Sequence, residues 1–346
     1  MKTLILPFLI LLTFCISCSP DIEETLEKNI ASYDVYVAGK ENNKACYWKN
    51  TIKTILLAGN GLEAGEIVID NSDMYVLGYQ HDFVNGVTNS CYWKNNVKYD
   101  IQQILGLQTS DDFHFKDIIF KSGDVYILGT IKNPASISIN DAYHLCYWKN
   151  GVKTTLENQP LYFPNSFIEK MYFHNNNLYI TSYKNYDPGN STVDFGYYKN
   201  GNYNFISNSN YRKFKQFFID GSTLNIITEG SNPSLEIYNT TSGTFSSFFI
   251  PNISYLYSAV RDGSDIYLNV GGAYYKNGTL ITLPTNTNGY VVSLDFKVLD
   301  GNIYLLRQKD SEGILGQKVY INNIETQSII SNNTGNKFNS ITVMPQ

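Results

Sequence analysis

The sequence predicts an all-β protein, and three observations support this prediction. The 346 residues include 28 Tyr and 19 Phe, and Val, Ile, Thr and Asn are abundant, a composition that favours strands and turns. No long stretch has the apolar spacing of an amphipathic helix. Short motifs recur along the chain, which indicates a repeated structural unit. A chain of this length has room for one large or two ordinary domains.

The first 18 residues are typical of a bacterial lipoprotein signal. Lys2 precedes an apolar segment from Leu4 to Phe14, which is shorter than the roughly 20 residues that span a bilayer. The segment ends in "CISC", which resembles the lipobox cut by signal peptidase II. This resemblance implies that Cys18 becomes the lipidated N-terminus of the mature chain. An ordinary secretory signal is the alternative.

Residues 19–32 are expected to form a flexible tether between the lipid and a single domain over residues 33–346. The tether begins with "SPDIEE", which resembles the acidic export signal of surface lipoproteins in Bacteroidota-type bacteria. The resemblance implies an outer-membrane lipoprotein that faces the cell exterior, although a solvated linker would begin in the same way. No later apolar run reaches membrane length, so the lipid is the only membrane anchor expected.

Two motifs alternate along residues 33–346. The first occurs as "DVYVAG" at Asp34, "DMYVLG" at Asp73 and "DVYILG" at Asp124, and "CYWKN" follows each copy at Cys46, Cys91 and Cys146. Weaker copies of the pair begin at Asn177, Asp265 and Asn302, and a degenerate copy at Thr223 makes seven. Each copy is flanked by two further apolar runs. The unit is therefore predicted to contain four short strands joined by turns rich in Asn and Gly.

The two ends of this region are expected to complete one another. The first copy lacks a preceding strand, whereas the final run "SITVM", residues 340–344, has no strands after it. If this run pairs with the first copy, every repeat has four strands and the ring closes without an open seam. The pattern resembles the seven-bladed β-propeller over about residues 33–345. That resemblance implies four-stranded antiparallel blades in one ring, and a monomer is expected.

The cysteines of the repeat are predicted to be buried free thiols. Gly196 and Ala273 occupy the equivalent position in later copies, so the position selects small volume. Equivalent positions in different blades lie far apart, whereas a disulfide needs Cα atoms within about 7 Å. A metal or disulfide role is the alternative, with no CxxC or paired-His pattern to support it. The neighbouring aromatic residues, Trp48, Trp93 and Trp148, are expected to pack between blades.

Function is expected on the face of the ring that carries the long connections. In a four-stranded meander, the connections between strands two and three and between successive blades lie on one face, which we call the long-loop face. The longest are residues 80–90, 131–144 and 183–195 in repeats two to four, whereas repeat six passes through "NVGGAYY" almost without a loop. The opposite face, with the turns rich in Asn and Gly, is called the short-turn face. His174 is predicted there and is assigned no role.

Aromatic, His and Asp side chains on the long-loop face are the candidate ligand-binding residues, because loops on a rigid scaffold carry binding groups. They are His81, Asp82, Phe83, Phe113, His114, Tyr143, His144, Tyr162, Tyr186 and Asp187. Aromatic rings beside Asp and Asn are typical of carbohydrate sites, but exposed loops of any protein with this composition contain the same residue types. No metal site is expected, because the histidines have no fixed spacing.

No catalytic residue is assigned. Glycoside cleavage needs two neighbouring carboxylates, and Asp82, Asp111, Asp112, Asp141, Asp187 and Asp194 are candidates by location only. No nucleophile elbow, phosphate-binding loop or Asp-box motif occurs, and no cofactor is expected. The net charge of -5 argues against a nucleic-acid partner.

The first functional hypothesis is a surface lipoprotein that binds a glycan, a peptide or a protein partner. A polysaccharide hydrolase or lyase that uses loop carboxylates is the second. A structural docking platform within an outer-membrane assembly is the third.

Overall fold

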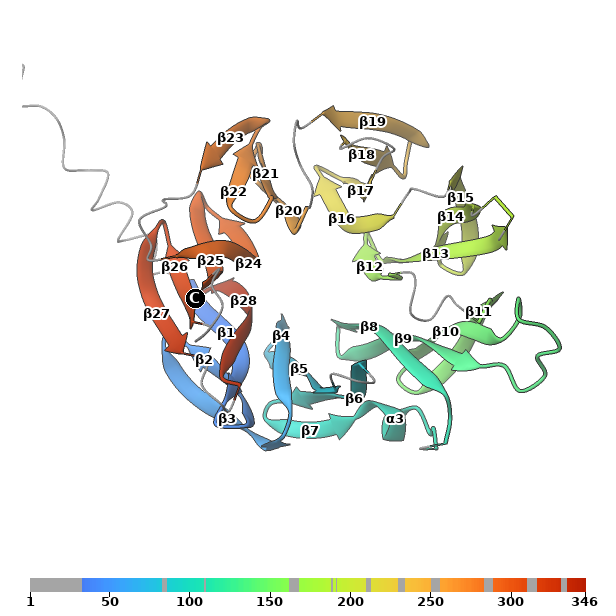
Figure 1. The fold of residues 1–346 in the computed structure, drawn as a ribbon, viewed down its shortest axis with the longest axis horizontal. Helices are drawn as coiled ribbons and strands as arrows, with labels where there is room; N and C mark the ends of the chain where they lie inside the picture. The colour runs from blue at the N-terminus through green and yellow to red at the C-terminus, as the bar shows by residue number, and fades with distance from the viewer. Residues whose placement is uncertain are drawn as a thin grey trace, which may run out of the picture.

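The protein is a seven-bladed β-propeller, as the repeat predicts. In the computed structural model, seven antiparallel sheets of four strands each stand in a ring (Figure 1). The structure describes residues 33–82, 86–108, 110–161, 168–187, 189–190, 192–209, 213–229, 234–249, 256–282, 289–309, 316–330 and 335–346. The predictions for the signal, for Cys18 and for the tether lie outside these residues.

The blades follow one another along the chain, and their strands are named from the inner strand outward. Blade 1 contains β28 (Lys337–Pro345), β1 (Tyr33–Glu41), β2 (Lys44–Lys49) and β3 (Ile52–Asn60). Blade 2 contains β4 (Glu63–Asp70), β5 (Asp73–Asp82), β6 (Gly86–Lys94) and β7 (Val97–Asp100). Blade 3 contains β8 (Phe113–Lys121), β9 (Asp124–Lys132), β10 (Tyr143–Lys149) and β11 (Val152–Gln159).

The later blades have the same order. Blade 4 contains β12 (Met171–His174), β13 (Asn177–Asp187), β14 (Thr192–Lys199) and β15 (Asn202–Ser209). Blade 5 contains β16 (Phe214–Asp220), β17 (Thr223–Glu229), β18 (Ser234–Asn239) and β19 (Thr244–Phe249). Blade 6 contains β20 (Ser258–Asp262), β21 (Asp265–Asn269), β22 (Ala273–Lys276) and β23 (Thr279–Thr282). Blade 7 contains β24 (Tyr290–Leu299), β25 (Asn302–Lys309), β26 (Gly316–Ile321) and β27 (Ile324–Ile330).

The ring closes between the two ends of the domain. Strand β28 pairs antiparallel with β1, from Tyr33 opposite Pro345 to Lys40 opposite Lys337, and Figure 1 shows the red β28 beside the blue β1. The final apolar run therefore supplies the inner strand of blade 1, as predicted. This pairing gives blade 1 its fourth strand and leaves no open seam in the ring.

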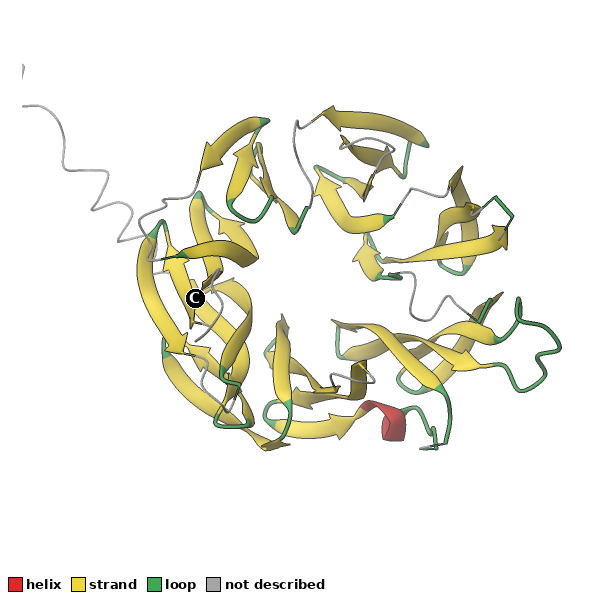
Figure 2. Cartoon of the chain, viewed as in Figure 1, coloured by secondary structure: helices red, strands yellow, loops and turns green. Residues whose placement is uncertain are grey.

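One short helix departs from the predicted pattern. The apolar run at the end of the second repeat predicts that Ile101 ends the outer strand of blade 2, but it opens α3 (Ile101–Ile104), which is drawn beside β7 in Figure 2. The Asp100 carboxylate caps this helix by accepting a hydrogen bond from the Gln103 N–H at 3.2 Å. Ile101 is fully buried between blades 2 and 3, so the helix covers the core where the short β7 ends.

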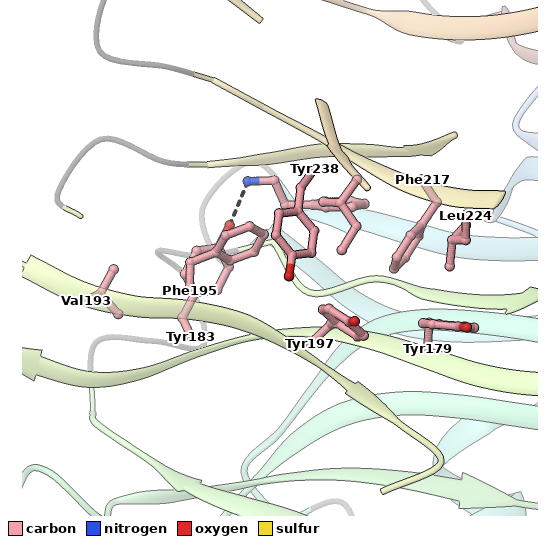
Figure 3. Close-up of a cluster of buried hydrophobic side chains, with 10 residues drawn as sticks. Tyr179, Tyr183, Val193, Phe195, Tyr197, Phe217, Leu224 and Tyr238 are labelled. Carbon is pink, nitrogen blue, oxygen red and sulfur yellow. Dashed lines mark hydrogen bonds between the residues drawn. The ribbon is translucent and has the colours of Figure 1, made fainter. Parts of the chain in front are cut away.

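A separate hydrophobic core fills each of the seven interfaces between neighbouring blades. Successive residues of one motif belong to different cores: Cys46 and Trp48 pack between blades 7 and 1, whereas Tyr47 packs between blades 1 and 2. Figure 3 shows the core between blades 4 and 5, where the Phe214 N–H donates to Tyr183 Oη at 2.8 Å. Middle strands are therefore covered on both faces, which explains why their apolar residues run consecutively.

The cysteine position is a narrow slot opposite a glycine. Cys46, Cys91 and Cys146 are free and buried, and each lies opposite the glycine of the preceding motif. A Cβ on Gly78, opposite Cys91, would lie 2.1 Å from the Trp93 ring, which no real packing allows. The glycine thus makes room for the tryptophan, and the thiol fills the small remaining volume.

These thiols are expected to be unreactive in the folded protein. Burial raises the pKa of Cys46 and of Cys91 to about 12, so almost no reactive thiolate is present near neutral pH. Peptide mapping after treatment with a maleimide at about pH 7.5 should find label at the three slot cysteines only when denaturant is added. A cysteine introduced by Ile52→Cys, at a side chain 73% exposed, should label in the native state. Equal labelling rates at the slot and at this control would contradict the prediction.

The aspartate of the first motif contacts the lysine and asparagine of the second motif on the short-turn face, and we call these three residues the clamp. In four blades the motif lysine lies 2.7 Å from the motif aspartate, in the pairs Lys49–Asp34, Lys94–Asp73, Lys149–Asp124 and Lys276–Asp265. The next residue is an asparagine with positive φ, and its side chain joins the same aspartate to the adjacent backbone. The recurrence of Asp, Lys and Asn therefore reflects turn geometry.

Blade 2 gives a direct test of this clamp. Asn95 has φ of 50°, accepts from the Met74 N–H at 2.9 Å and donates to Asp73 Oδ1 at 2.7 Å. Asn95→Ala should lower the unfolding free energy by about 1–2 kcal/mol, because it removes these bonds and strains the left-handed backbone. Asn95→Gly should cost less, because glycine adopts positive φ freely. Urea unfolding of both variants checks the order, and an equal loss in both would contradict the backbone contribution.

Candidate functional site: the long-loop face of blades 3 and 4

The long-loop face is high over blades 2 to 4 and low over blade 6. Strands β13 and β14 of blade 4 extend to Asp187 and Thr192, whereas β21 of blade 6 ends at Asn269 and β22 begins at Ala273. The asymmetry agrees with the sequence, but two of the predicted long loops are largely strand. Segments 80–90 and 183–195 are mostly continuations of their hairpins. Of the three segments, only blade 3 has a long connection outside the strands, at residues 133–142.

A polar cluster lies at the edge of blade 3. Tyr143 Oη donates to Asp112 Oδ2 at 2.6 Å, and His114 Nε2 lies 3.0 Å from the other oxygen of the same carboxylate. The His114 and Tyr143 rings meet edge to face, with centroids 5.5 Å apart. Burial, followed by the Asp112 contact, raises the pKa of Tyr143 to about 12. The phenol therefore remains a hydrogen-bond donor to Asp112.

Two further contacts connect this cluster to its surroundings. His144 Nδ1 and Asn158 Oδ1 are hydrogen bonded at 2.8 Å across β10 and β11. The backbone N–H of Lys132 donates to the Asp112 carbonyl at 3.0 Å. The cluster therefore lies at the base of the 133–142 connection. We call residues 111–114, 131–144 and 157–161 together the blade 3 rim.

The 133–142 connection is held by its own hydrogen bonds. Asn133 is buried, and its side chain accepts from the Ala135 N–H and donates to the Asp141 carbonyl. The Asp141 carboxylate accepts from Ser136 Oγ at 2.8 Å and from the Ser138 N–H at 3.0 Å. These hydrogen bonds lower the pKa of Asp141, and the bond from Ser136 has the largest effect. The carboxylate thus forms its hydrogen bonds within its own loop.

The tip of this loop presents apolar side chains to solvent. Ile137 is 95% exposed and Ile139 is 57% exposed. The Leu161 N–H donates to the Ile139 carbonyl at 2.8 Å, and Leu161 is itself 46% exposed. Three large aliphatic residues therefore project from neighbouring segments whose backbones are hydrogen bonded to one another. They are not among the predicted site residues, because the sequence pattern favours polar and aromatic side chains as ligand contacts.

The other predicted site residues have different positions. Phe113 is half-buried and packs edge to face on Trp148 in the core between blades 2 and 3. Tyr186 packs against the core between blades 4 and 5. Asp187 accepts from the Gly189 N–H and from Asn190 within its own hairpin. Phe83, Tyr162 and the side chains of His81 and Asp82 lie outside what the structure describes.

A polar network between blades 3 and 4, which includes the rim residue Glu157, was not predicted. Glu157, between blades 3 and 4, accepts from Tyr198 Oη at 2.7 Å and from Ser182 Oγ, and it lies 3.1 Å from Lys184 Nζ. Lys184 also stands 3.9 Å over the Tyr203 ring. Burial and then Glu157 raise the pKa of Tyr198. These residues come from sequence-distant strands, and no local spacing relates them.

The described carboxylates of the face hold its backbone and side chains in place. Asp111 accepts from the Gln108 N–H at 2.8 Å, and Asp194 accepts from Asn185 and Asn208 at 2.7 and 2.6 Å. Among the described residues, no three His, Cys, Asp or Glu side chains are placed to hold a metal ion. The arrangement is that of a surface of hydrogen-bonding and apolar groups.

Comparison with solved structures shows the propeller class and no closer relationship. A puromycin-hydrolysing peptidase of Mycobacterium tuberculosis matches 86% of this chain and 51% of its own, at 9% identity and a TM-score of 0.51. Pyrococcus horikoshii acylaminoacyl peptidase matches 86% of this chain and 50% of its own, at 10% identity and a TM-score of 0.50. Apo AztD from Citrobacter koseri matches 90% of this chain and 98% of its own, at 10% identity and a TM-score of 0.50.

The chain spans about half the length of the two peptidases. Neither a protein-family model nor a curated protein sequence matches it. Identities near one tenth show the fold alone. In the described part of the chain, no helix is long and apolar enough to cross a membrane.

Proposed function

We propose that the chain is an outer-membrane lipoprotein, exposed at the cell exterior, that binds a polypeptide partner through the blade 3 rim. The observation that carries this proposal is the loop tip with Ile137 and Ile139 exposed on a backbone fixed by Asn133 and Asp141. An exposed aliphatic side chain gains roughly 1.5–3 kcal/mol on full burial. A preformed loop loses little conformational entropy when it binds.

A polypeptide fits the described rim better than a glycan does. Sugar recognition by stacking requires exposed flat rings, but Tyr143 is 7% exposed and Phe113 packs into the core. Protein interfaces are typically centred on apolar anchors surrounded by polar groups. Ile137 and Ile139 would supply the apolar anchors, and polar groups are present at the base of the same loop, where Lys132 contacts Asp112.

The position of the first described residue supports the proposed orientation. Tyr33 begins β1 at the short-turn face, where Asp34 contacts Lys49. A tether that starts at a lipidated Cys18 would therefore join the domain on the face opposite the rim. Labelling with a palmitate analogue should be lost in Cys18→Ala, and protease added to intact cells should degrade the wild-type protein. Labelling that persists in Cys18→Ala would overturn the anchor.

The rim is tested by photocrosslinking in the native cell. A photoreactive amino acid at Asn140 should capture a defined protein, whereas one at Val152, on the outer strand of the same blade, should not. The captured protein is then purified, and its affinity for the Ile137→Asp variant should fall roughly tenfold or more. Val152→Asp is the matched control, because Val152 is 71% exposed but lies away from the rim.

Two outcomes would contradict a polypeptide-binding rim. One is that Ile137→Asp and Val152→Asp weaken the binding of the purified partner equally. The other is a glycan array that finds a bound or cleaved glycan sensitive to Tyr143→Phe, in the absence of capture at residue 140. His174→Ala, on the opposite face, is the control for the array.

A further inference from the structure

A small apolar pocket lies between blades 7 and 1 on the short-turn face. Its volume is about 270 Å³, and it is lined by Tyr33, Val35, Asn50, Thr51, Val319, Ile321, Thr326, Gln327 and Gln346. Sites for whole small-molecule ligands usually measure roughly 300–1,000 Å³. This pocket is smaller than that range and far larger than the about 30 Å³ share of one water. Its size and lining suit one or two aliphatic side chains.

Residues 19–32 join the domain at this pocket. Tyr33 is both the first described residue and part of the pocket wall. Residues 19–32 are mostly polar and acidic, and Ile22, Leu26 and Ile30 are their large aliphatic residues. Ile30 is three residues before Tyr33, and three extended residues span about 10 Å. Ile30 can therefore reach a pocket that Tyr33 itself lines.

We propose that residues 19–32 dock on the short-turn face in the same molecule, with the Ile30 side chain in this pocket. A short flexible connection gives an effective concentration in the millimolar range. A separate copy of the chain at micromolar concentration competes poorly against that value. Docking shortens the free part of the tether and holds the short-turn face toward whatever the tether is attached to. This inference does not depend on lipidation or on the blade 3 rim.

Cleavage by trypsin after Lys28 tests the docked state in the full-length chain. Docking of Ile30 should protect Lys28, so Ile30→Asp is expected to accelerate cleavage there at least fivefold. Ile22→Asp is the matched control and should change the rate less than twofold, because residue 22 is farther from Tyr33 along the chain. An equal rate in wild type and Ile30→Asp would overturn the proposal. So would protection that disappears on dilution, because that indicates a second copy in the pocket.

A photocrosslink provides a measurement on the pocket itself. A photoreactive residue at Thr326 should crosslink to residues 26–32, and the yield should fall at least fivefold in Ile30→Asp. In a mixture of isotopically heavy and light chains, the crosslinked peptides should pair light with light and heavy with heavy. Crosslinks that combine heavy and light chains, or that omit residues 26–32, would overturn docking in the same molecule.

Discussion

Replacing Phe338 by alanine is expected to lower the unfolding free energy by roughly 3–5 kcal/mol. Phe338 is 1% exposed in the core between blades 7 and 1, and its ring meets Trp48 edge to face with centroids 4.8 Å apart. Its backbone N–H donates to Gln317 of blade 7. The residue therefore belongs to the strand that closes the ring and also packs across the interface that it closes. Urea unfolding monitored by tryptophan fluorescence measures the loss.

A substitution on the outer strand of the same interface serves as the control. Ile324 is 66% exposed on β27, and Ile324→Ala should change the unfolding free energy by less than about 0.5 kcal/mol. If Phe338→Ala cost no more than this control, the closing strand would contribute little to stability. The ring would then be held together chiefly by its other six interfaces.

The repeat and its closure could be predicted because each depends on residues that recur in the sequence. The Cys46, Cys91 and Cys146 slot could be interpreted because blades 4 and 6 place Gly196 and Ala273 at the same position. The rule does not extend to every blade, because blades 5 and 7 place Glu236 and Lys318 there. The function of the Asp, Lys and Asn positions was less accessible. The sequence indicates a turn at these positions. Only the structure shows that one carboxylate contacts both the lysine and the asparagine of its repeat, at Asp34, Asp73, Asp124 and Asp265.

The placement of the long connections was predictable, and the exposure of the side chains on them was less so. Loop length located the high side of the long-loop face, but it did not show that the hairpin of blade 4 continues to Asp187. Residue type suggested Phe113 as a ligand contact, whereas the glycine at position 129 leaves space for its ring in the core. Exposure of Ile137 could not be predicted from its apolar character. Burial is a property of the whole fold, and local sequence does not determine it.

The interface between blades 3 and 4 contains a buried ion pair, and removal of one partner is expected to destabilise the protein. Lys116 Nζ lies 2.8 Å from Glu169 Oε2, with the two side chains 7% and 0% exposed. Gln159 Nε2 donates to the other oxygen of Glu169 at 3.1 Å. Lys116→Met should lower the unfolding free energy by about 3–5 kcal/mol near pH 7.5, because it leaves an uncompensated charge in the interior. Lys318→Met, which breaks a more exposed pair with Glu325 at 2.6 Å, should cost less than about 1 kcal/mol.

The pH dependence separates loss of the charge partner from loss of packing. Burial raises the pKa of Glu169 above its ordinary value of 4.5, and Lys116 opposes this effect. A carboxyl group with a raised folded-state pKa binds protons more tightly when folded, so its contribution to stability improves as the pH falls through that pKa. Removing Lys116 should raise this pKa further. The deficit of Lys116→Met should therefore shrink between about pH 7.5 and pH 5.

A double variant distinguishes the lost charge from the lost lysine stem. Lys116→Met combined with Glu169→Leu removes both charges, and replacement of a buried ion pair by apolar residues is often neutral or stabilising. The double variant should therefore recover most of the loss near pH 7.5 and should show no pH-dependent deficit. If its stability were no better than that of Lys116→Met, packing of the lysine stem would explain the effect. Recovery would instead show that the loss in Lys116→Met comes from the unpaired charge of Glu169 between blades 3 and 4.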